Sequence, residues 1–263
     1  MLQNYQTLLT SLKEKVLTIT LNRPQVHNAM NAAMIAELTE IFKNIPVNGT
    51  VRTVVLKGNG KSFCAGADIN YMKTIATFGF EDNVADGEKL AALFMAIYQC
   101  PVPTIAMVHG VAFGGANGLL AACDVVIAEE NTRFAFSEVK LGIAPATIGP
   151  FVIKRIGEYG AKELMLTGKR FTAEEAKSWK LVNYSLPQEK TEEKLQNMLN
   201  EFKTAAPQAV QKTKQMIKKI VSDNDIKETL NYTAGLIAEL RASQEGQEGM
   251  EAFLEKRKPE WTK

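Results

Sequence analysis

A glycine-rich segment, HGVAFGGANGLLAACD at residues 109–124, leads into an apolar stretch that carries no charge before Asp124. Its glycines follow neither of the phosphate-binding patterns G-x-G-x-x-G and G-x-x-x-x-G-K-[ST], so the segment does not predict a nucleotide site. Glycine does allow a ligand to approach the backbone, and the first N–H groups of a helix have no partner within it. With the helix dipole behind them, such N–H groups attract negative charge. The segment therefore predicts backbone donors for a negatively charged oxygen.

A second turn of small residues lies in GNGKSFCAGADINYM, residues 58–72. Ala65, Gly66 and Ala67 stand between an apolar strand and a short helix that Asp68 is expected to begin. Two such turns could each contribute one N–H to an oxygen that gains negative charge during a reaction, as in an oxyanion hole. Tight packing of a strand on a helix explains either turn about equally well.

An acid or base for such a reaction is offered by Glu138, in TRFAFSEVKLGIAPATIGP at residues 132–150. Glu138 follows a short apolar strand and precedes a turn rich in glycine and proline, so its carboxyl group could lie in an apolar pocket with a raised pKa. Alternatively, Glu138 only begins a helix. His27 and His109 are too far apart in the sequence to suggest a metal pair, and no metal site is predicted.

The elements that would position these residues alternate along the chain. Residues 17–21 of VLTITLN show the period of a half-buried strand, and residues 53–58 form a second apolar strand. Between them, residues 28–45 have apolar side chains at helical spacing, with Asn28 or Asn31 as the cap and Pro46 after the end. A strand at 103–110, a short helix and a strand at 124–130 repeat this order. The pattern predicts a layered α/β domain.

Two regions depart from that alternation. The acidic stretch TFGFEDNVADGEKL, residues 77–90, is expected to be a mobile loop that leads into a helix and could cover a ligand. From Lys162 onward the strand signals fade. The segment PQAVQKTKQMIKKI, residues 207–220, is expected to be an amphipathic helix with its lysines on the polar face. This tail predicts a helical appendage.

The composition favours small-molecule chemistry or protein contacts over nucleic-acid binding. The chain has 263 residues, of which 46% are hydrophobic, and its net charge is only +2. Three widely spaced cysteines match no disulfide or zinc pattern and are expected to be buried thiols. The first residues do not have the layout of a signal peptide, so a cytoplasmic location is expected.

Several of these motifs, in this order, resemble the crotonase (enoyl-CoA hydratase/isomerase) superfamily. Besides the segments already quoted, they are LTITLNRP and NAMN near the start, GKRFTAEEAKSWKLVN, and EGMEAFLEKRKPEW near the end. The resemblance covers nearly the whole chain. It implies a spiral of ββα units in an acyl-CoA-binding core, residues 1–200, and a helical region for oligomerisation and coenzyme A cover, residues 201–263. It also implies a homotrimer or a dimer of trimers, and no cofactor, because coenzyme A is part of the substrate.

The resemblance implies roles for individual residues. The backbone N–H groups of Ala67 and Gly115 correspond to an oxyanion hole that holds the thioester oxygen as it becomes an enolate. Hydratases of the family orient water with two glutamates, and Glu138 corresponds to the second of them. The first position is Gly118 here, so one of the two groups that hold the water is missing. The residues expected to contact the substrate or its coenzyme A are Gln25, His27, Ala65, Asp68, Ile69 and Gly118, with Phe253 and Lys256 from a neighbouring subunit.

Three functions follow from this resemblance. The favoured one is hydration of an acyl-CoA thioester with Glu138 as the main acid and base. The quoted motifs resemble bacterial hydratases of the methylglutaconyl-CoA type, in leucine or isoprenoid degradation, whose substrates carry a second carboxylate. On this hypothesis, Gly118→Glu would raise hydration of crotonyl-CoA, provided that the helix tolerates the larger side chain. The second function is double-bond isomerisation by Glu138 alone. The third is binding without catalysis, as a coenzyme A scaffold or an RNA-binding protein that uses the lysines of residues 212–219; a solvated helix face explains those lysines better.

Overall fold

Two β-sheets form the frame of the structure, a computed structural model that describes residues 4–223 and 225–262. The strands are β1 (Leu8–Lys13), β2 (Val16–Leu21), β3 (Thr53–Gly58), β4 (Thr104–Val108), β5 (Val111–Phe113), β6 (Val125–Glu129), β7 (Arg133–Ala135), β8 (Arg170–Thr172) and β9 (Tyr184–Leu186). The larger sheet has the order β1-β2-β3-β4-β6-β9. Its adjacent strands are parallel, except that β1 and β2 pair antiparallel. The smaller sheet has the order β5-β7-β8.

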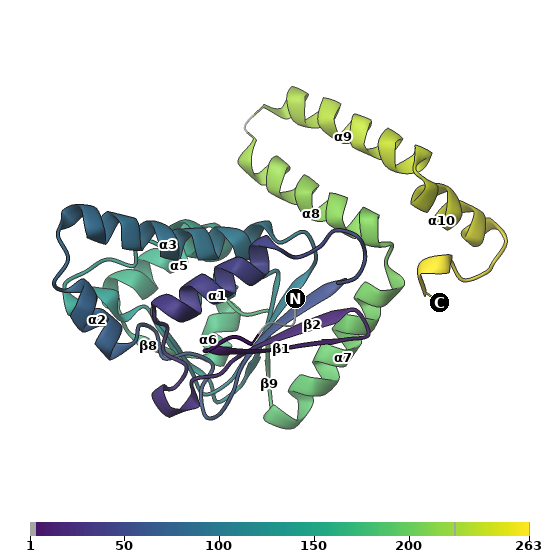
Figure 1. Ribbon diagram of the computed structural model, residues 1–263. Coiled ribbons are helices and arrows are strands. Elements are labelled where there is room, and N and C mark those ends of the chain that lie inside the picture. Colours follow the sequence, from purple (N-terminus) through teal and green to yellow (C-terminus); the bar gives the residue numbers. More distant parts are fainter. Residues whose placement is uncertain (1–3, 224, 263) are drawn as a thin grey trace.

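Helices cover both faces of the larger sheet. The described helices are α1 (Ala32–Lys43), α2 (Ile69–Ile75), α3 (Phe80–Gln99), α4 (Ala116–Ala122), α5 (Gly149–Thr167), α6 (Ala173–Ser178), α7 (Gln188–Thr204), α8 (Pro207–Ser222), α9 (Ile226–Ala242) and α10 (Gln244–Leu254), with 3-10 turns η1 (Pro24–Val26), η2 (Ser137–Leu141) and η3 (Glu260–Thr262). Figure 1 shows α1 and α3 along one side of the strands and α7 on another. The predicted layered α/β architecture is confirmed.

The two faces of β3 explain its uninterrupted apolar sequence. Val54 and Leu56 belong to the main core beneath the helices. Val55, between them, points to the opposite face and packs in a second cluster with Leu195 of α7. A parallel strand buried on both faces has no need of polar positions.

The first helix forms as its sequence predicts. Asn31 is the cap of α1, because its side chain accepts a hydrogen bond from the N–H of Met34 at 3.0 Å. The apolar positions at helical spacing are buried, among them Ile35, Leu38 and Phe42. Asn28, the alternative cap, is buried and donates to the carbonyl groups of the neighbouring turn instead.

The expectation of a mobile loop at residues 77–90 is wrong, because α3 begins within it at Phe80. Glu81 and Asp82 lie in the first turn of the helix, where negative charge is favourable next to the helix dipole. The hydroxyl group of Tyr71 in α2 also donates a hydrogen bond to Asp86. The acidic residues of this segment therefore lie at the start and on the outer face of α3, and the hydrogen bond from Tyr71 connects α3 to α2.

The C-terminal part is mainly helical, as expected, but β8 and β9 also lie within it and were not predicted from the sequence. In Figure 1, α8, α9 and α10 extend away from the sheets. Lys214 of α8 is buried against the core, where its Nζ lies 2.5 Å from Asp124 and donates to the carbonyl of Val102 at 2.9 Å. A buried charge that loses its partner is costly, so this ion pair holds the start of the appendage to the core.

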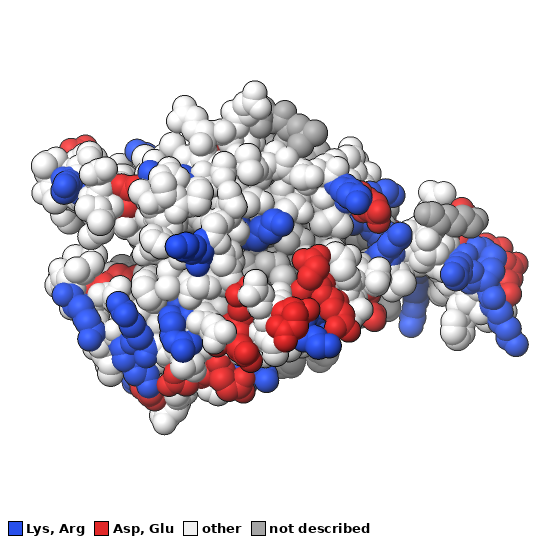
Figure 2. All heavy atoms as spheres, turned by 90° about the horizontal axis from the view of Figure 1, so that it is seen from below, with Lys and Arg blue, Asp and Glu red and all other residues white. Residues whose placement is uncertain are grey.

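The lysines of residues 212–219 do not form an open basic surface. Lys212 pairs with Glu239 at 2.7 Å, Lys219 with Asp223 at 3.7 Å, and Lys214 with Asp124. Lys218 lies over the ring of Tyr98, 5.2 Å from its centre. On the face that Figure 2 presents, acidic side chains also lie near basic ones, with no extended surface of basic side chains alone. This arrangement disfavours the RNA-binding interpretation. Among the described residues, no helix is long and apolar enough to cross a membrane.

Candidate active site

The two turns of small residues lie next to each other. Cys64 and Ala112 form a parallel bridge, in which Cys64 donates to Val111 at 3.1 Å and Phe113 donates to Cys64 at 3.2 Å. Gly66 has φ +98°, and a β-carbon on it would lie 3.0 Å from the carbonyl oxygen of Phe113. Glycine is therefore required for both the conformation and the close approach. The predicted convergence of the two turns is confirmed.

Among the residues that the structure describes, the backbone N–H groups of Ala67 and Gly115 are free at this junction. Met30 bridges the first turn, since its N–H donates to the Gly66 carbonyl at 2.7 Å and its carbonyl accepts the Asp68 N–H at 2.8 Å. In the second turn, the N–H of Gly114 donates to Ala135 at 2.9 Å. In residues 4–223 and 225–262, the N–H groups of Ala67 and Gly115 have no acceptor. Gly115 is the cap of α4, so its N–H stands at the positive end of a helix dipole. The resemblance assigns these two N–H groups to an oxyanion hole, and that role remains a prediction.

Glu138 is brought to the same junction by the smaller sheet. Strand β7 pairs in parallel with β5, so both strands end at the same edge of the sheet. There β5 continues into Gly114 and β7 continues toward Glu138. One carboxyl oxygen of Glu138, Oε1, lies 3.4 Å from the position that a β-carbon on Gly114 would take. Glu138 therefore follows a strand and lies in the first turn of η2, which agrees with the local structure expected in both of its sequence interpretations.

The surroundings of Glu138 favour the protonated form of its carboxyl group. Burial raises its pKa above the ordinary value, and its own backbone N–H only partly offsets this effect. Its Oε2 atom is buried and has no hydrogen-bond partner in the described part of the chain. A carboxyl group with a raised pKa next to two free N–H groups is suited to moving a proton on a molecule whose oxygen those N–H groups hold.

A sequence model of the enoyl-CoA hydratase/isomerase family matches residues 11–263. The chain belongs to this enzyme family. The short-chain-enoyl-CoA hydratase of Clostridium acetobutylicum is 34% identical over 252 residues, 94% of each chain. The 2,3-dehydroadipyl-CoA hydratase of Escherichia coli K12 is 31% identical over 97% of this chain and 98% of its own. The crystal structure of an enoyl-CoA hydratase from Shewanella pealeana has a TM-score of 0.93 at 37% identity, over 99% of this chain and 97% of that one. The expected crotonase fold is therefore confirmed.

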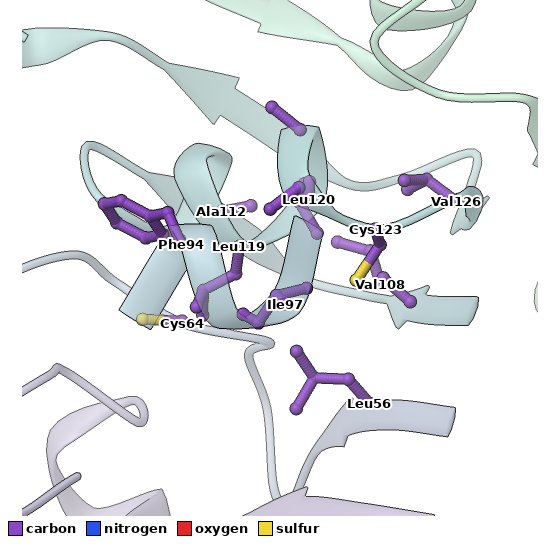
Figure 3. Close-up of a cluster of buried hydrophobic side chains, with 14 of the residues drawn as sticks. Leu56, Cys64, Phe94, Ile97, Val108, Ala112, Leu119, Leu120, Cys123 and Val126 are labelled. Atoms are coloured by element: carbon purple, nitrogen blue, oxygen red, sulfur yellow. The ribbon is translucent and has the colours of Figure 1, made fainter. Parts of the chain in front are cut away.

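Gly118, where hydratases of the enoyl-CoA hydratase/isomerase family are expected to have a glutamate, is covered by apolar side chains. All seven residues of α4 are buried, and a β-carbon on Gly118 would lie 2.5 Å from Ile148 Cγ2 and 2.7 Å from the ring of Phe94. Figure 3 shows Phe94 with Leu119 and Leu120 of α4 in one apolar cluster. Core side chains therefore take the space that a side chain at this position would need, and the substrate contact of Gly118 remains a prediction.

The condition set for Gly118→Glu, that the helix tolerates a larger side chain, is not met, because Ile148 and Phe94 occupy the space. Room for a glutamate would require a smaller residue at Phe94 as well. Even Gly118→Ala should lower the free energy of unfolding by about 1–3 kcal/mol, because a methyl group overpacks two fully buried side chains. Chemical denaturation measures this change. Gly235→Ala in α9, where nothing lies within 4 Å, is the matched control and should be neutral or stabilising. Equal stability of the two variants would contradict the overpacking.

The segment expected to contact coenzyme A runs along the first of the two turns. The carbonyl of His27 accepts the N–H of Ala65 at 3.0 Å, and its ring nitrogen Nδ1 lies 3.0 Å from the hydroxyl group of Ser62. Gln25, His27 and Ile69 are exposed. Their binding of coenzyme A remains a prediction, and the exposed backbone and side chains leave this edge of the site open.

Asp68 has a structural role that its sequence motif only partly indicates. Its carboxylate accepts the N–H groups of Asn70 and Tyr71 at the start of α2 and pairs with Arg23 at 2.9 Å. Burial opposes its ionisation, but these hydrogen bonds outweigh burial and lower its pKa. Its side chain is thus engaged within the chain, as are its backbone N–H, which donates to Met30, and its carbonyl, which accepts from Met72. The Arg23 partner was not predicted.

Phe253 and Lys256 lie far along the chain, in and after α10, and Phe253 is 82% exposed. Their predicted contact with the coenzyme A of a neighbouring subunit remains a prediction. His109 bonds to the carbonyl of Gly60 at 2.9 Å, and the described residues contain no group of three or more His, Cys, Asp or Glu side chains that could hold a metal ion. All three cysteines are buried free thiols, as expected.

Proposed function

We propose that this protein is an enoyl-CoA hydratase that adds water to, or removes it from, an acyl-CoA thioester through an enolate. The observation that supports this most is the position of the Glu138 carboxyl beside Gly114, next to the free N–H groups of Ala67 and Gly115. Three groups at one junction then supply the two needs of the reaction, a stabilised oxygen and a transferable proton.

In the addition direction, Glu138 takes a proton from water while the water oxygen bonds to C3 of the 2-enoyl thioester. The electron pair of the double bond moves onto the thioester oxygen, where Ala67 and Gly115 donate their N–H groups. Glu138 then gives its proton to C2 and the carbonyl re-forms. The carboxyl group ends as it began, so one carboxyl suffices for the proton balance.

We propose a substrate with a branch or a second carboxylate, such as methylglutaconyl-CoA. Because the site has Gly118 in place of the first glutamate, the reacting water must be held by backbone groups or by an acid of the substrate itself. The similarity to the 2,3-dehydroadipyl-CoA hydratase supports this, because its name describes a thioester of a dicarboxylic acid. A homotrimer or dimer of trimers fits the exposed apolar side chains of the last helices, which include Ile226, Leu230, Ile237, Phe253 and Leu254.

Double-bond isomerisation is the second candidate, and the covered position of Gly118 favours it. Moving a double bond from C3 to C2 requires one group that removes a proton from C2 and returns it to C4. Glu138 alone can do so. Holding a water molecule is then unnecessary, which is consistent with the apolar Phe94 and Ile148 beside α4.

One set of assays separates the two candidates. Purified protein is incubated with 2-enoyl-CoA and 3-enoyl-CoA thioesters, linear, branched and carboxylated, and products are measured by mass and ultraviolet absorbance. Hydration adds one water to the 2-enoyl thioesters and removes the absorbance of the conjugated bond. A gain of that absorbance from 3-enoyl thioesters, with no water added to any substrate, would overturn hydration in favour of isomerisation.

A further inference from the structure

Asn117 is a buried polar residue that the sequence interpretation passed over. It is the second residue of α4 and is 0% exposed. Its side-chain Nδ2 donates to the carbonyl of Ala135 at 2.9 Å and to that of Gly114 at 3.3 Å. Its Oδ1 is buried and has no partner in the described part of the chain. Burying an unpaired oxygen is unfavourable, so stability alone does not account for an amide here.

The Gly114 carbonyl that Asn117 contacts belongs to the same peptide unit as the Gly115 N–H. That carbonyl accepts the Asn117 backbone N–H at 2.9 Å and its side chain as well. A peptide unit is planar, so holding its carbonyl end fixes the direction of its N–H. Hydrogen bonds to the carbonyl also polarise the unit and make its N–H a stronger donor. The free N–H of Gly115 is therefore aimed by Asn117.

The second contact of Asn117 reaches the segment that carries the acid. Ala135 is the last residue of β7, three positions before Glu138, and its carbonyl accepts both the Gly114 N–H and the Asn117 side chain. Phe136, next in the chain, is fully buried and stacks on Phe171 at 5.7 Å between ring centres. Asn117 is thus connected to the Glu138 segment through one hydrogen bond to Ala135, and the buried, stacked Phe136 holds the chain between Ala135 and Glu138 in place.

We propose that Asn117 is a positioning residue whose side-chain amide fixes the position of the Gly115 N–H relative to the segment that carries Glu138. This rests on the proposed function in that both groups act on one acyl-CoA thioester. Asn117 touches neither the substrate nor its reacting atoms. Its two hydrogen bonds connect the turn that holds the oxygen to the strand that delivers the carboxyl group.

The test uses Asn117→Leu, which keeps roughly the size of the side chain and removes both donated bonds. Acetoacetyl-CoA is the probe, since its enolate absorbs in the near ultraviolet and places negative charge on the oxygen that the N–H groups would hold. We expect the variant to bind this enolate about tenfold or more weakly, a part of the 10²–10³-fold effect of losing an oxyanion donor. Binding of butyryl-CoA, whose oxygen is uncharged, should change little. With an active substrate, kcat should fall and KM should stay.

Thr104→Val is the matched control. Thr104 is also buried, and its hydroxyl group bonds to Asp124 just beyond the other end of α4, so the variant loses buried hydrogen bonds away from the junction. It should keep the enolate affinity even if its thermal stability falls. If Asn117→Leu does not fold, Asn117→Ala is measured in its place. Wild-type enolate affinity in the folded variant would overturn the proposal, as would the absence of an enolate band with the unaltered protein. Missing hydration with the band present would overturn only the proposed function.

Discussion

Replacing Glu138 with glutamine should lower kcat by about 10²–10⁴-fold, the usual contribution of a general acid or base. Glutamine keeps the shape of the side chain but cannot take a proton from water or return one to carbon. The affinity for an unreactive acyl-CoA should stay nearly unchanged, because the free N–H groups of Ala67 and Gly115 are not altered. Steady-state kinetics on an active thioester and calorimetric titration with a saturated one measure the two effects.

The pH dependence gives a second readout for Glu138. Burial raises the pKa of its carboxyl, and hydration needs the carboxylate form as the base. The rate should therefore fall as the pH is lowered through this raised pKa, at a higher pH than an ordinary glutamate would give. The residual rate of Glu138→Gln should lack that fall. Glu158→Gln, at an exposed residue paired with Lys162 on α5, is the control and should behave as wild type. Unchanged turnover in Glu138→Gln would contradict both hydration and isomerisation.

Ala67→Pro should lower kcat by about 10²–10³-fold, as the loss of one oxyanion donor does. Proline lacks the N–H group, so the substitution removes the predicted donor itself. It breaks no hydrogen bond within the described part of the chain, because that N–H has no acceptor there, and Ala67 is exposed. Steady-state kinetics measure the loss, and circular dichroism shows whether the fold is retained.

Ala67→Ser is the matched control for the proline variant. It keeps the N–H group and adds only a hydroxyl group on an exposed side chain, so its kcat should stay within a few-fold of wild type, roughly the effect of an ordinary surface change. A folded Ala67→Pro variant with the activity of Ala67→Ser would show that this N–H does not hold the substrate oxygen. Loss of activity in both would indicate that the turn tolerates no change at all.

The predictable parts of the fold are those in which local chemistry decides the structure. The cap at Asn31, the short helix that Asp68 begins and the glycine requirement at Gly66 all follow from residue types at fixed spacing. The start of α3 at Phe80 was missed because acidic residues serve equally well in a loop and in the first turn of a helix. Strands β1, β8 and β9 lack a strong apolar period and depend on pairing with the sheets.

The candidate site was predictable in its parts, but not in how distant segments fill its surroundings. Glu138 and the two small-residue turns could be chosen from the sequence, since each combines a reactive or donating group with a turn. Nothing in the sequence shows that Phe94, which precedes Gly118 by 24 positions, covers it. Asn117 gave no signal either, because its importance comes from the carbonyl groups that parallel pairing of β5 and β7 brings to it.

Helix α4 has a consequence for the electrostatics of the site. Its seven residues carry no charged side chain and are all buried, so dissolved ions cannot reach the helix along its length. Charges exposed to solvent are screened over about 10 Å at 0.1 M salt, whereas groups inside the protein are screened much less. The positive end of α4 therefore acts on the oxygen at Gly115 through the protein interior. The enolate would be stabilised to nearly the same extent in dilute and concentrated salt. If the phosphates of coenzyme A bind at the open edge, as predicted, their interactions with the protein would weaken as the salt concentration rises.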